Sequence, residues 1–484
     1  MHFGEELKLA KIYITTLGCP KNQVDSGHLT KALLSEGFIH TDNADDADII
    51  VVNTCGFIRA AKEESIEEIL RLSVLKTNSK KLIVFGCLAK RYKDELIKDI
   101  PEIDAIFGVG EDCSIIEYCK KLMKRRNGET ERQRDENSPI HPFTDSPIHQ
   151  SYAYLKIAEG CNKKCTFCVI PSIRGRFRSI PPEIILKEAE EHIQSGVKEL
   201  ILVAQDITNY GKEYGGYNLV SLLKDISSIN PVRSLHIASI TARNTINQNL
   251  HGETSNGIKG DFRIRLLYLY PTEITSELLQ YIAKNNKIQK YLDIPLQHSE
   301  DKILRLMGRR GTKKEYIKLI RNIRRTIPGV ALRTTFIVGF PGETEEDFHG
   351  LVDFIEEMRF DRLGVFKYSK EEGSWAEKLK GHVPEKVKAR RFDEIMRRQA
   401  HISFEINRGL IGKRYDAIVD EVDGSLAIAR TYSHAPEIDG VVIIDRAVAS
   451  STQLVECLTL KVGDLVTVEI VDAFDYDLKG RLIK

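Results

Sequence analysis

Three cysteines in the middle of the chain most constrain what it can fold into. Cys161, Cys165 and Cys168 are spaced C-x3-C-x2-C and follow a short apolar run at 154–158. Three thiolates on one tight loop can ligate three corners of a 4Fe–4S cluster. Because the loop has no fourth cysteine, one iron would stay open to bind a small molecule. A zinc knuckle is the alternative, but zinc sites usually pair C-x2-C halves and add a fourth protein ligand. The pattern therefore indicates a reactive cluster.

Three more cysteines follow predicted strands in the amino-terminal third. Strands are expected at 12–16, 48–52 and 81–85, separated by helical stretches, the first helix starting near residue 25. This alternation predicts a parallel sheet with helices on both faces. Strand carboxyl ends then face one crevice, so Cys19, Cys55 and Cys87 should meet there. They predict a second cluster with its own open iron, the alternative being three buried small hydrophobic side chains.

Strand–helix units continue after the cysteine loop. Strands are expected at 154–158, 199–204, 265–270, 291–294, 331–338 and 362–367, with helices at 179–194 and from about residue 345. Such units predict a partial (β/α)6 barrel with its site at the carboxyl ends of the strands. The polar or glycine candidates at those ends are Gln205, Asp206, Gln297, His298, Arg333, Gly339, Gly342 and Glu343. Each of them alone fits a cap or a turn equally well.

The carboxyl-terminal part changes to short strands at 415–419, 426–431, 441–445 and 465–473, separated by Asp-Gly turns. These predict a small antiparallel barrel. From residue 412 onward there are 13 acidic and 8 basic residues. An acidic surplus repels RNA phosphates and attracts a basic polypeptide, although it also fits mere solubility.

The predicted organisation is α/β overall. The expected domains are 10–125, which holds the second cysteine set, a linker at 126–148, the barrel at 149–395 and the small β-barrel at 396–484. A polar stretch at 233–261 is expected to be a surface insertion. The 71 basic and 70 acidic residues nearly cancel, and no apolar run approaches 18 residues. We therefore expect a cytoplasmic protein without a membrane partner, in which Cys113, Cys119 and Cys457 are structural.

The motifs resemble a known enzyme family. The loop from Cys161 to Cys168 resembles the signature of radical S-adenosylmethionine enzymes. Together with residues 17–22, 53–56 and 86–87, it makes the chain similar to the methylthiotransferases from about residue 11 to the end. Four stretches resemble the branch that modifies a ribosomal protein: 18–22, 265–271, 360–366 and 435–440. The carboxyl-terminal barrel resembles the TRAM domain, which binds RNA in the tRNA-modifying relatives.

This resemblance implies two 4Fe–4S clusters and S-adenosylmethionine, which is both radical source and methyl donor. The cluster on Cys161, Cys165 and Cys168 would bind S-adenosylmethionine and yield a 5′-deoxyadenosyl radical. The cluster on Cys19, Cys55 and Cys87 would carry the sulfur to be inserted. The expected cofactor-binding residues are Phe167, Gln205, Gln297, Arg333 and Gly339, with Phe167 near adenine. No catalytic residue is assigned beyond the cluster ligands.

The implied substrate is the β-carbon of an aspartate in a basic small-subunit ribosomal protein, protein twelve. An electron donor protein is the second expected partner, and we do not expect tRNA binding. One alternative is a tRNA adenosine methylthiotransferase. The other is a non-catalytic iron–sulfur protein that binds the ribosome or senses redox state.

Overall fold

The amino-terminal domain is a five-stranded parallel sheet with the order β2-β1-β3-β4-β5. The computed structural model describes residues 10–126, 151–230, 262–445 and 460–483. The strands are β1 (Lys11–Thr16), β2 (Ile39–His40), β3 (Ile49–Thr54), β4 (Lys81–Gly86) and β5 (Ala105–Phe107). All six residues of the central β3 are buried, as in a strand covered on both faces.

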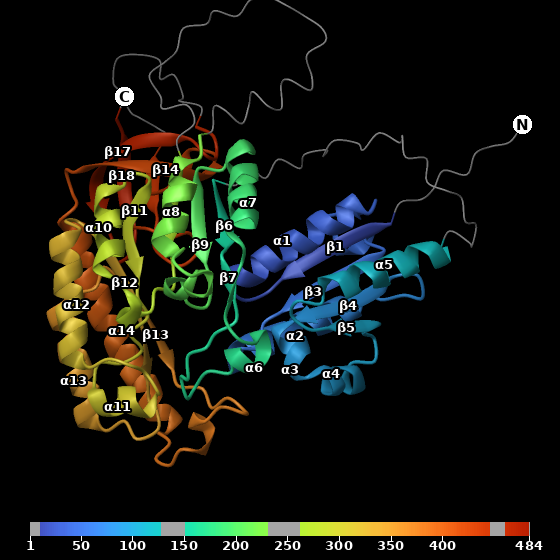
Figure 1. The fold of residues 1–484 in the computed structure, drawn as a ribbon, viewed down its shortest axis with the longest axis horizontal. Helices are drawn as coiled ribbons and strands as arrows, with labels where there is room; N and C mark the ends of the chain where they lie inside the picture. The colour runs from blue at the N-terminus through green and yellow to red at the C-terminus, as the bar shows by residue number, and fades with distance from the viewer. Residues whose placement is uncertain (1–9, 127–150, 231–261, 446–459, 484) are drawn as a thin grey trace, which may run out of the picture.

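Helices cover both faces of this sheet (Figure 1). One face packs against α1 (Pro20–Ser35) and α5 (Asp112–Arg126), the other against α2 (Arg59–Ser73), α3 (Cys87–Arg91) and α4 (Lys93–Asp99). The predicted two-sided parallel sheet is confirmed. The first helix begins at Pro20, earlier than the expected residue 25, because proline suits the first turn of a helix. Cys19 is therefore the residue that caps α1.

The central domain is a six-stranded, wholly parallel sheet with the order β13-β12-β11-β10-β9-β6. Its strands are β6 (Tyr152–Lys156), β9 (Glu199–Val203), β10 (Arg263–Leu266), β11 (Ile288–Asp293), β12 (Ala331–Val338) and β13 (Arg362–Lys367). This confirms the predicted partial barrel. The strand expected at 265–270 ends early, because Tyr268 has a φ of +65° and leaves the extended conformation.

Helices pack on the outer face of this curved sheet. They are α7 (Pro182–Gln194), α8 (Leu219–Ser228), α10 (Ser276–Lys284), α11 (Asp301–Leu306), α12 (Lys313–Thr326), α13 (Glu345–Met358) and α14 (Glu385–Arg408). A separate apolar cluster joins Tyr154, Ile201 and Tyr291 of the sheet to Val24 of α1 and Ala435 of the last domain. Side chains from both flanking domains therefore pack into the central domain.

The carboxyl-terminal domain is a closed five-stranded barrel with the order β14-β15-β16-β18-β17. Its strands are β14 (Arg414–Asp423), β15 (Leu426–Arg430), β16 (Val442–Asp445), β17 (Leu465–Ala473) and β18 (Leu478–Leu482). The predicted small β-barrel is confirmed; four of its five strand pairs are antiparallel, whereas β16 and β18 pair in parallel. An odd number of strands in a closed ring cannot alternate in direction at every pair. The strand β18 was not predicted.

Two expected boundaries meet the structure differently. The division predicted between residues 395 and 396 falls inside α14, and the first barrel strand begins at Arg414. Three further expectations fall outside the described residues. They concern the linker at 126–148, of which only Arg126 is described, the insertion at 233–261, and Cys457. Among the described helices, none has the length and apolar character to cross a membrane.

Candidate functional site

The loop with Cys161, Cys165 and Cys168 lies beyond the end of β6. It connects β7 (Ala158–Glu159) to α6 (Ile170–Arg174). Backbone hydrogen bonds hold it: Cys161 donates to the carbonyl of Gly175 at 3.1 Å, and Cys168 to that of Cys165 at 3.1 Å. Burial raises the pKa of Cys168 to about 12, and the neighbouring thiols of Cys165 and Cys161 raise it further. The three thiols are thus close enough to act on one another.

The other predicted set also converges, because the loops that carry Cys19, Cys55 and Cys87 are in direct contact. A Cβ atom added at Gly18 would lie 2.9 Å from the sulfur of Cys55. One added at Gly56 would lie 3.0 Å from the carbonyl carbon of Cys87. Only glycine allows these approaches, so the sequence neighbours of the cysteines are part of the site.

Amide side chains hold two of these loops in place. Asn22 donates to the carbonyl of Leu17 at 2.7 Å and to that of Thr54 at 3.3 Å. Asn53 donates to the carbonyl of Asn22 at 2.9 Å and to the hydroxyl of Ser26 at 2.9 Å. These hydrogen bonds tie the loop before Cys19 to the end of β3, where Cys55 follows.

The electrostatic surroundings of the three thiols differ. Burial raises the pKa of Cys87 to about 11 and also raises that of Cys55. Burial acts to raise the pKa of Cys19, but the charges of Lys21 and Arg174 and hydrogen bonds from the backbone of Asn22 and Lys21 together lower it more. Arg174 acts to lower the pKa of all three thiols. A cation shared by three cysteines favours thiolates, the form that binds metals.

Arg174 connects the two cysteine sets. It ends α6, the helix that follows Cys168, and its side chain is only 2% exposed. The guanidinium donates to Asn22 at 2.6 Å, to Asp25 at 3.1 Å and to Glu159 at 3.0 Å. Sequence reasoning missed this residue. The available signal was Pro171, which predicts a helix start directly after the cysteine loop.

Apolar packing brings the two sets together at a second point. Cys87 lies in one buried cluster with Val169 and Ile173, and Val169 is the residue after Cys168. Figure 1 shows α6 beside α3, where the amino-terminal domain meets the central domain. The two sets of thiols therefore lie on either side of one contact between domains.

The donor chemistry of both sets fits iron–sulfur clusters. All six residues are free cysteines, and each set has three thiols on converging loops. Among the described residues, no group of three or more His, Cys, Asp or Glu side chains could hold a metal ion in the present geometry. In a 4Fe–4S cluster each cysteine binds a different iron, so its ligands need not converge on a single point.

Of the residues expected to bind the cofactor, Phe167 and Gln205 lie at this site. Phe167 is within the cysteine loop and packs edge-to-face on Phe340, with ring centroids 6.3 Å apart. Gln205 donates to Glu159 at 3.1 Å, and its buried carbonyl oxygen has no hydrogen-bond partner among the described residues. A bound ligand with a donor group would satisfy that oxygen.

Gln297, Arg333 and Gly339 lie elsewhere or have other partners. Gln297 has a φ of +72° and bonds to β12 through its backbone. Arg333 forms an ion pair with Asp439 of the last domain at 2.7 Å. A Cβ atom added at Gly339 would lie 2.3 Å from a side-chain carbon of Lys388, so α14 is what approaches this glycine closely.

The remaining polar candidates have structural partners. Asp206 accepts a hydrogen bond from the backbone of Thr208 and pairs with Lys163 at 3.3 Å. Glu343 accepts from the backbone of Phe340 and pairs with Arg391 at 2.9 Å. Burial raises the pKa of Glu343 to about 7 and lowers that of His298 to about 3. Of the cysteines predicted to be structural, Cys119 is buried and Cys113 is exposed.

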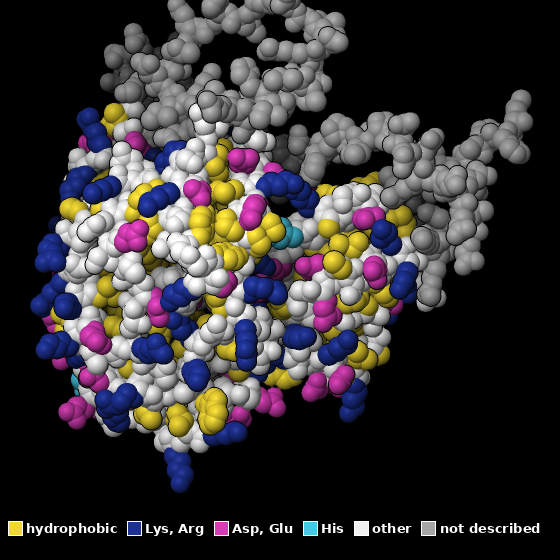
Figure 2. All heavy atoms as spheres, in the orientation of Figure 1, with side chains coloured by type: hydrophobic (Ala, Val, Ile, Leu, Met, Phe, Trp, Pro, Cys, Tyr) yellow, Lys and Arg dark blue, Asp and Glu magenta, His cyan; other side chains and the backbone are white. Residues whose placement is uncertain are grey.

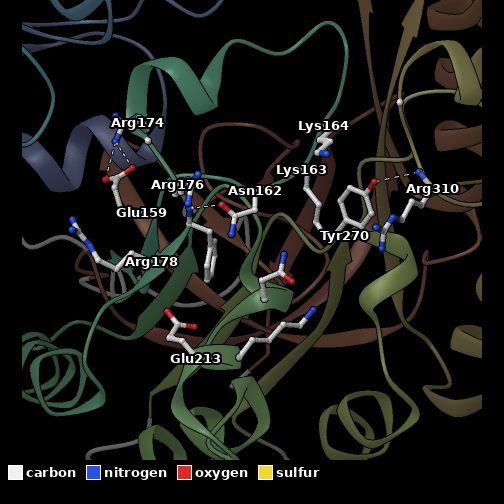
Figure 3. Close-up of a pocket in the computed structure, with 15 residues that line it drawn as sticks. Glu159, Asn162, Lys163, Lys164, Arg174, Arg176, Arg178, Glu213, Tyr270 and Arg310 are labelled. Atoms are coloured by element: carbon white, nitrogen blue, oxygen red, sulfur yellow. Dashed lines mark hydrogen bonds and ion pairs between the residues drawn. The ribbon is translucent and has the colours of Figure 1, made fainter.

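A cavity of about 1070 Å³ adjoins the cysteine loop (Figure 3). Its walls come from the loop, from the segment after α6, and from the turns that follow β9, β10 and α11. Seven basic residues line it, against two acidic ones: Lys163, Lys164, Arg174, Arg176, Arg178, Lys212 and Arg310 against Glu159 and Glu213. None of the six cysteines lines this cavity.

Comparisons with known proteins agree with this architecture. Family models match residues 11–108 (Uncharacterized protein family UPF0004), 155–355 (Radical SAM superfamily) and 411–483 (TRAM domain). The protein "Ribosomal protein uS12 methylthiotransferase RimO" of Thermodesulfovibrio yellowstonii is 54% identical over 97% of this chain and 99% of its own length. The protein of the same name from Carboxydothermus hydrogenoformans is 41% identical over 98% and 99%.

A solved structure has the same fold at low sequence identity. It is the radical S-adenosylmethionine methyltransferase TsrM from Kitasatospora setae, with cobalamin and a [4Fe-4S] cluster bound. The TM-score is 0.50 at 14% identity, over 87% of this chain and 80% of that one.

Proposed function

Because the chain belongs to the family of ribosomal protein uS12 methylthiotransferases named RimO, we propose that it adds a methylthio group to the β-carbon of an aspartate in uS12, small-subunit ribosomal protein twelve. Its identity to these relatives extends over nearly the whole length of both chains. The substrate assignment therefore rests on similarity along the whole chain and not on one shared domain. The cytoplasm, where thiols stay reduced, suits a protein with six metal-binding cysteines.

One observation supports two-cluster chemistry above all: Arg174 ends the helix that follows the first cysteine set and lies beside all three thiols of the second set. Inserting sulfur into an unactivated C–H bond needs a radical source beside a sulfur source. Cys161, Cys165 and Cys168 would hold the first cluster, and Cys19, Cys55 and Cys87 the second. When bound, the first cluster and S-adenosylmethionine supply a 5′-deoxyadenosyl radical for hydrogen abstraction.

The residues around the two cysteine sets would bind and orient the reacting groups and protect them from water. Arg174 keeps positive charge beside the thiols of the second set, which favours their thiolate form. The carboxylate of Glu159 accepts hydrogen bonds from Arg174 and from the amide of Gln205, and so fixes both side chains. Phe167 offers an aromatic face beside the first set. Burial of Cys55, Cys87 and Arg174 limits the access of water to the second set.

The acidic surplus of the last domain supports a basic substrate only weakly, because several of the acidic residues already have partners within the protein. Asp420 is paired with Arg430, and Asp439 with Arg333. Glu437 accepts a hydrogen bond from Gln23 of α1 at 3.0 Å and another from Tyr152 of β6 at 2.6 Å. Asp439 and Glu437 therefore bond to other domains and Asp420 to its own domain, so fewer carboxylates remain to meet a partner.

The test is anaerobic reconstitution followed by reaction with purified uS12 and, separately, with tRNA. We expect about eight irons per chain and the mass gain of one methylthio group on uS12. A gain on tRNA alone would overturn the substrate assignment. Absence of S-adenosylmethionine cleavage under dithionite would favour a non-catalytic iron–sulfur protein.

Single cysteine variants separate the proposed roles. Cys165→Ala should abolish 5′-deoxyadenosine formation, whereas Cys55→Ala should retain it and lose methylthio transfer. Cys113→Ala is the matched control, because this thiol is exposed and lies outside both sets. Loss of both reactions in Cys55→Ala would argue against separate roles for the two sets.

A further inference from the structure

Four cations around the cavity beside the cysteine loop have no partner for their charge among the residues that the structure describes. Lys164, Arg176, Arg178 and Arg310 are exposed. Within the described parts of the chain, their side chains form neither an ion pair nor a hydrogen bond. Other cations of the same cavity are neutralised: Lys163 and Lys212 both pair with Glu273, at 3.0 and 2.7 Å. The four free charges therefore dominate the local field.

These cations surround the loop that would hold the radical-generating cluster. Lys164 lies between Cys161 and Cys165, and Arg176 follows Arg174 by two residues. Arg310 comes from the turn after α11, where a Cβ atom at Gly308 would lie 2.4 Å from the carbonyl of Lys164. In Figure 3 these side chains come from different segments around one hollow. In Figure 2, dark blue side chains gather where Figure 1 shows α6 and its preceding loop.

We propose that these four cations, the docking patch, bind an acidic one-electron carrier protein that reduces the cluster held by Cys161, Cys165 and Cys168. The inference rests on the proposed function, which needs an external electron for each cleavage of S-adenosylmethionine. One electron passes from the reduced carrier to the cluster, the carrier is oxidised by one electron, and no atoms are exchanged.

The position of the patch favours electron transfer over substrate binding. A substrate carbon must touch the reacting groups, yet none of the six cysteines lines the cavity. An electron can transfer across a single protein loop. Here that loop is the one with Cys161, Cys165 and Cys168, which forms part of the cavity wall. Lys163 and Lys164 belong to this loop and lie between Cys161 and Cys165 in the sequence.

The electrostatics suit a transient partner. Exposed charges of one sign raise the association rate of an oppositely charged protein and make it dependent on salt. A carrier that must leave after each electron needs such a weak, charge-steered contact more than a large apolar interface.

The test compares two charge-reversal variants of the reconstituted holoenzyme. The first is Arg176→Glu with Arg310→Glu, in the patch. The matched control is Lys314→Glu with Lys318→Glu, two exposed cations on α12. Iron content and circular dichroism verify that both variants keep their clusters and fold. The probe is flavodoxin, an acidic one-electron carrier, whose affinity is measured by calorimetry at low and at raised salt.

We expect the patch variant to lose about tenfold or more in affinity for flavodoxin at low salt. Its flavodoxin-driven S-adenosylmethionine cleavage should fall in parallel, while cleavage driven by dithionite, a small reductant, should stay as in wild type. The α12 control should resemble wild type in all three measurements.

Several results would overturn the inference. One is unchanged flavodoxin affinity; another is an equal loss of the dithionite-driven reaction, which would place these arginines at the cofactor. Weaker binding to a small-subunit RNA fragment with flavodoxin binding intact would assign the patch to RNA. If wild type fails to cleave S-adenosylmethionine with dithionite, the proposed function fails, whereas the affinity measurement still tests the patch.

Discussion

The guanidinium of Arg174 donates to the side-chain oxygen of Asn22 at 2.6 Å, across 152 positions of the chain. Arg174 lies six residues after Cys168, and Asn22 three residues after Cys19. This one hydrogen bond links α6, the helix after the first cysteine set, to α1, the helix that Cys19 of the second set precedes as its N-cap residue. The separation of the two sets is therefore set by buried polar contacts as well as by apolar packing.

Arg174→Met should weaken the junction and uncouple the two sets. The change leaves Asp25 and Glu159 with Lys156 as their remaining cation and removes the buried hydrogen bond to Asn22, and an unsatisfied buried polar group costs about 1–3 kcal/mol. We expect a lower melting temperature and a greater loss of methylthio transfer than of S-adenosylmethionine cleavage. Arg59→Met, which removes an exposed partner of Glu63, should change neither. Equal loss of both reactions would contradict this role.

Gly18→Ala should damage the second cysteine set selectively. The added Cβ would lie 2.6 Å from that of Cys55, at a φ of +96°. Gly37→Ala is the control for backbone strain, because its φ is +88° but no atom of the described residues lies within 4 Å of an added Cβ. Iron analysis should show about half the wild-type content in Gly18→Ala and full content in Gly37→Ala. Full content in both would refute the contact.

Alkylation of the metal-free protein should depend on pH differently at each thiol of the second set. A thiol reacts as its thiolate, which forms as pH rises through the pKa. The pKa of Cys19 is lowered from 9.0, whereas that of Cys87 is about 11. Mass spectrometry should find Cys19 modified at lower pH than Cys87.

Lys21→Met should move the alkylation of Cys19 to higher pH. Lys21 is the first of the two cations that lower the pKa of this thiol. Lys31→Met, in an exposed pair with Glu191, serves as the control. An unchanged alkylation profile for Cys19 would show that Lys21 has no such effect.

Glu199→Gln should destabilise the contact between the central domain and the last domain. Glu199 is fully buried and accepts from Arg265 at 2.7 Å and from Arg430 at 2.5 Å. Without this charge, buried Arg265 loses its carboxylate partner, whereas Arg430 keeps Asp420; breaking a buried pair costs about 3–5 kcal/mol. The exposed pair of Glu469 with Arg481 should contribute less than about 1 kcal/mol, so Glu469→Gln is the control. Similar melting temperatures for both variants would contradict this prediction.

Local patterns allowed much of the fold to be predicted. The strands β12 and β13 and the start of α13 lie where the sequence indicates, because alternation and capping residues are local signals. The positions of Cys19, Cys55 and Cys87 followed from the same reasoning. The carboxyl ends of parallel strands lie at one edge of the sheet, so cysteines that follow three such strands lie close together.

Contacts between distant segments were not predictable in this way. Arg333 was expected at the cofactor but pairs with Asp439, and the parallel pairing of β16 with β18 was missed. The free cations of the docking patch come from segments that are adjacent only in the folded chain. No periodicity or spacing records which side chain a distant residue will face.

The sequence by itself indicated the proposed chemistry of this protein: six cysteines in two sets, one set on a single loop beyond the end of β6 and the other on three loops that follow parallel strands. The tertiary structure alone decided that Arg174, in the helix after the first set, lies beside the second set, that the last domain packs into the central sheet and that four cations have no charge partner among the described residues. The physical reason is that strand and helix formation depends on near neighbours in sequence. Burial and charge pairing depend on which surfaces meet after the chain has folded.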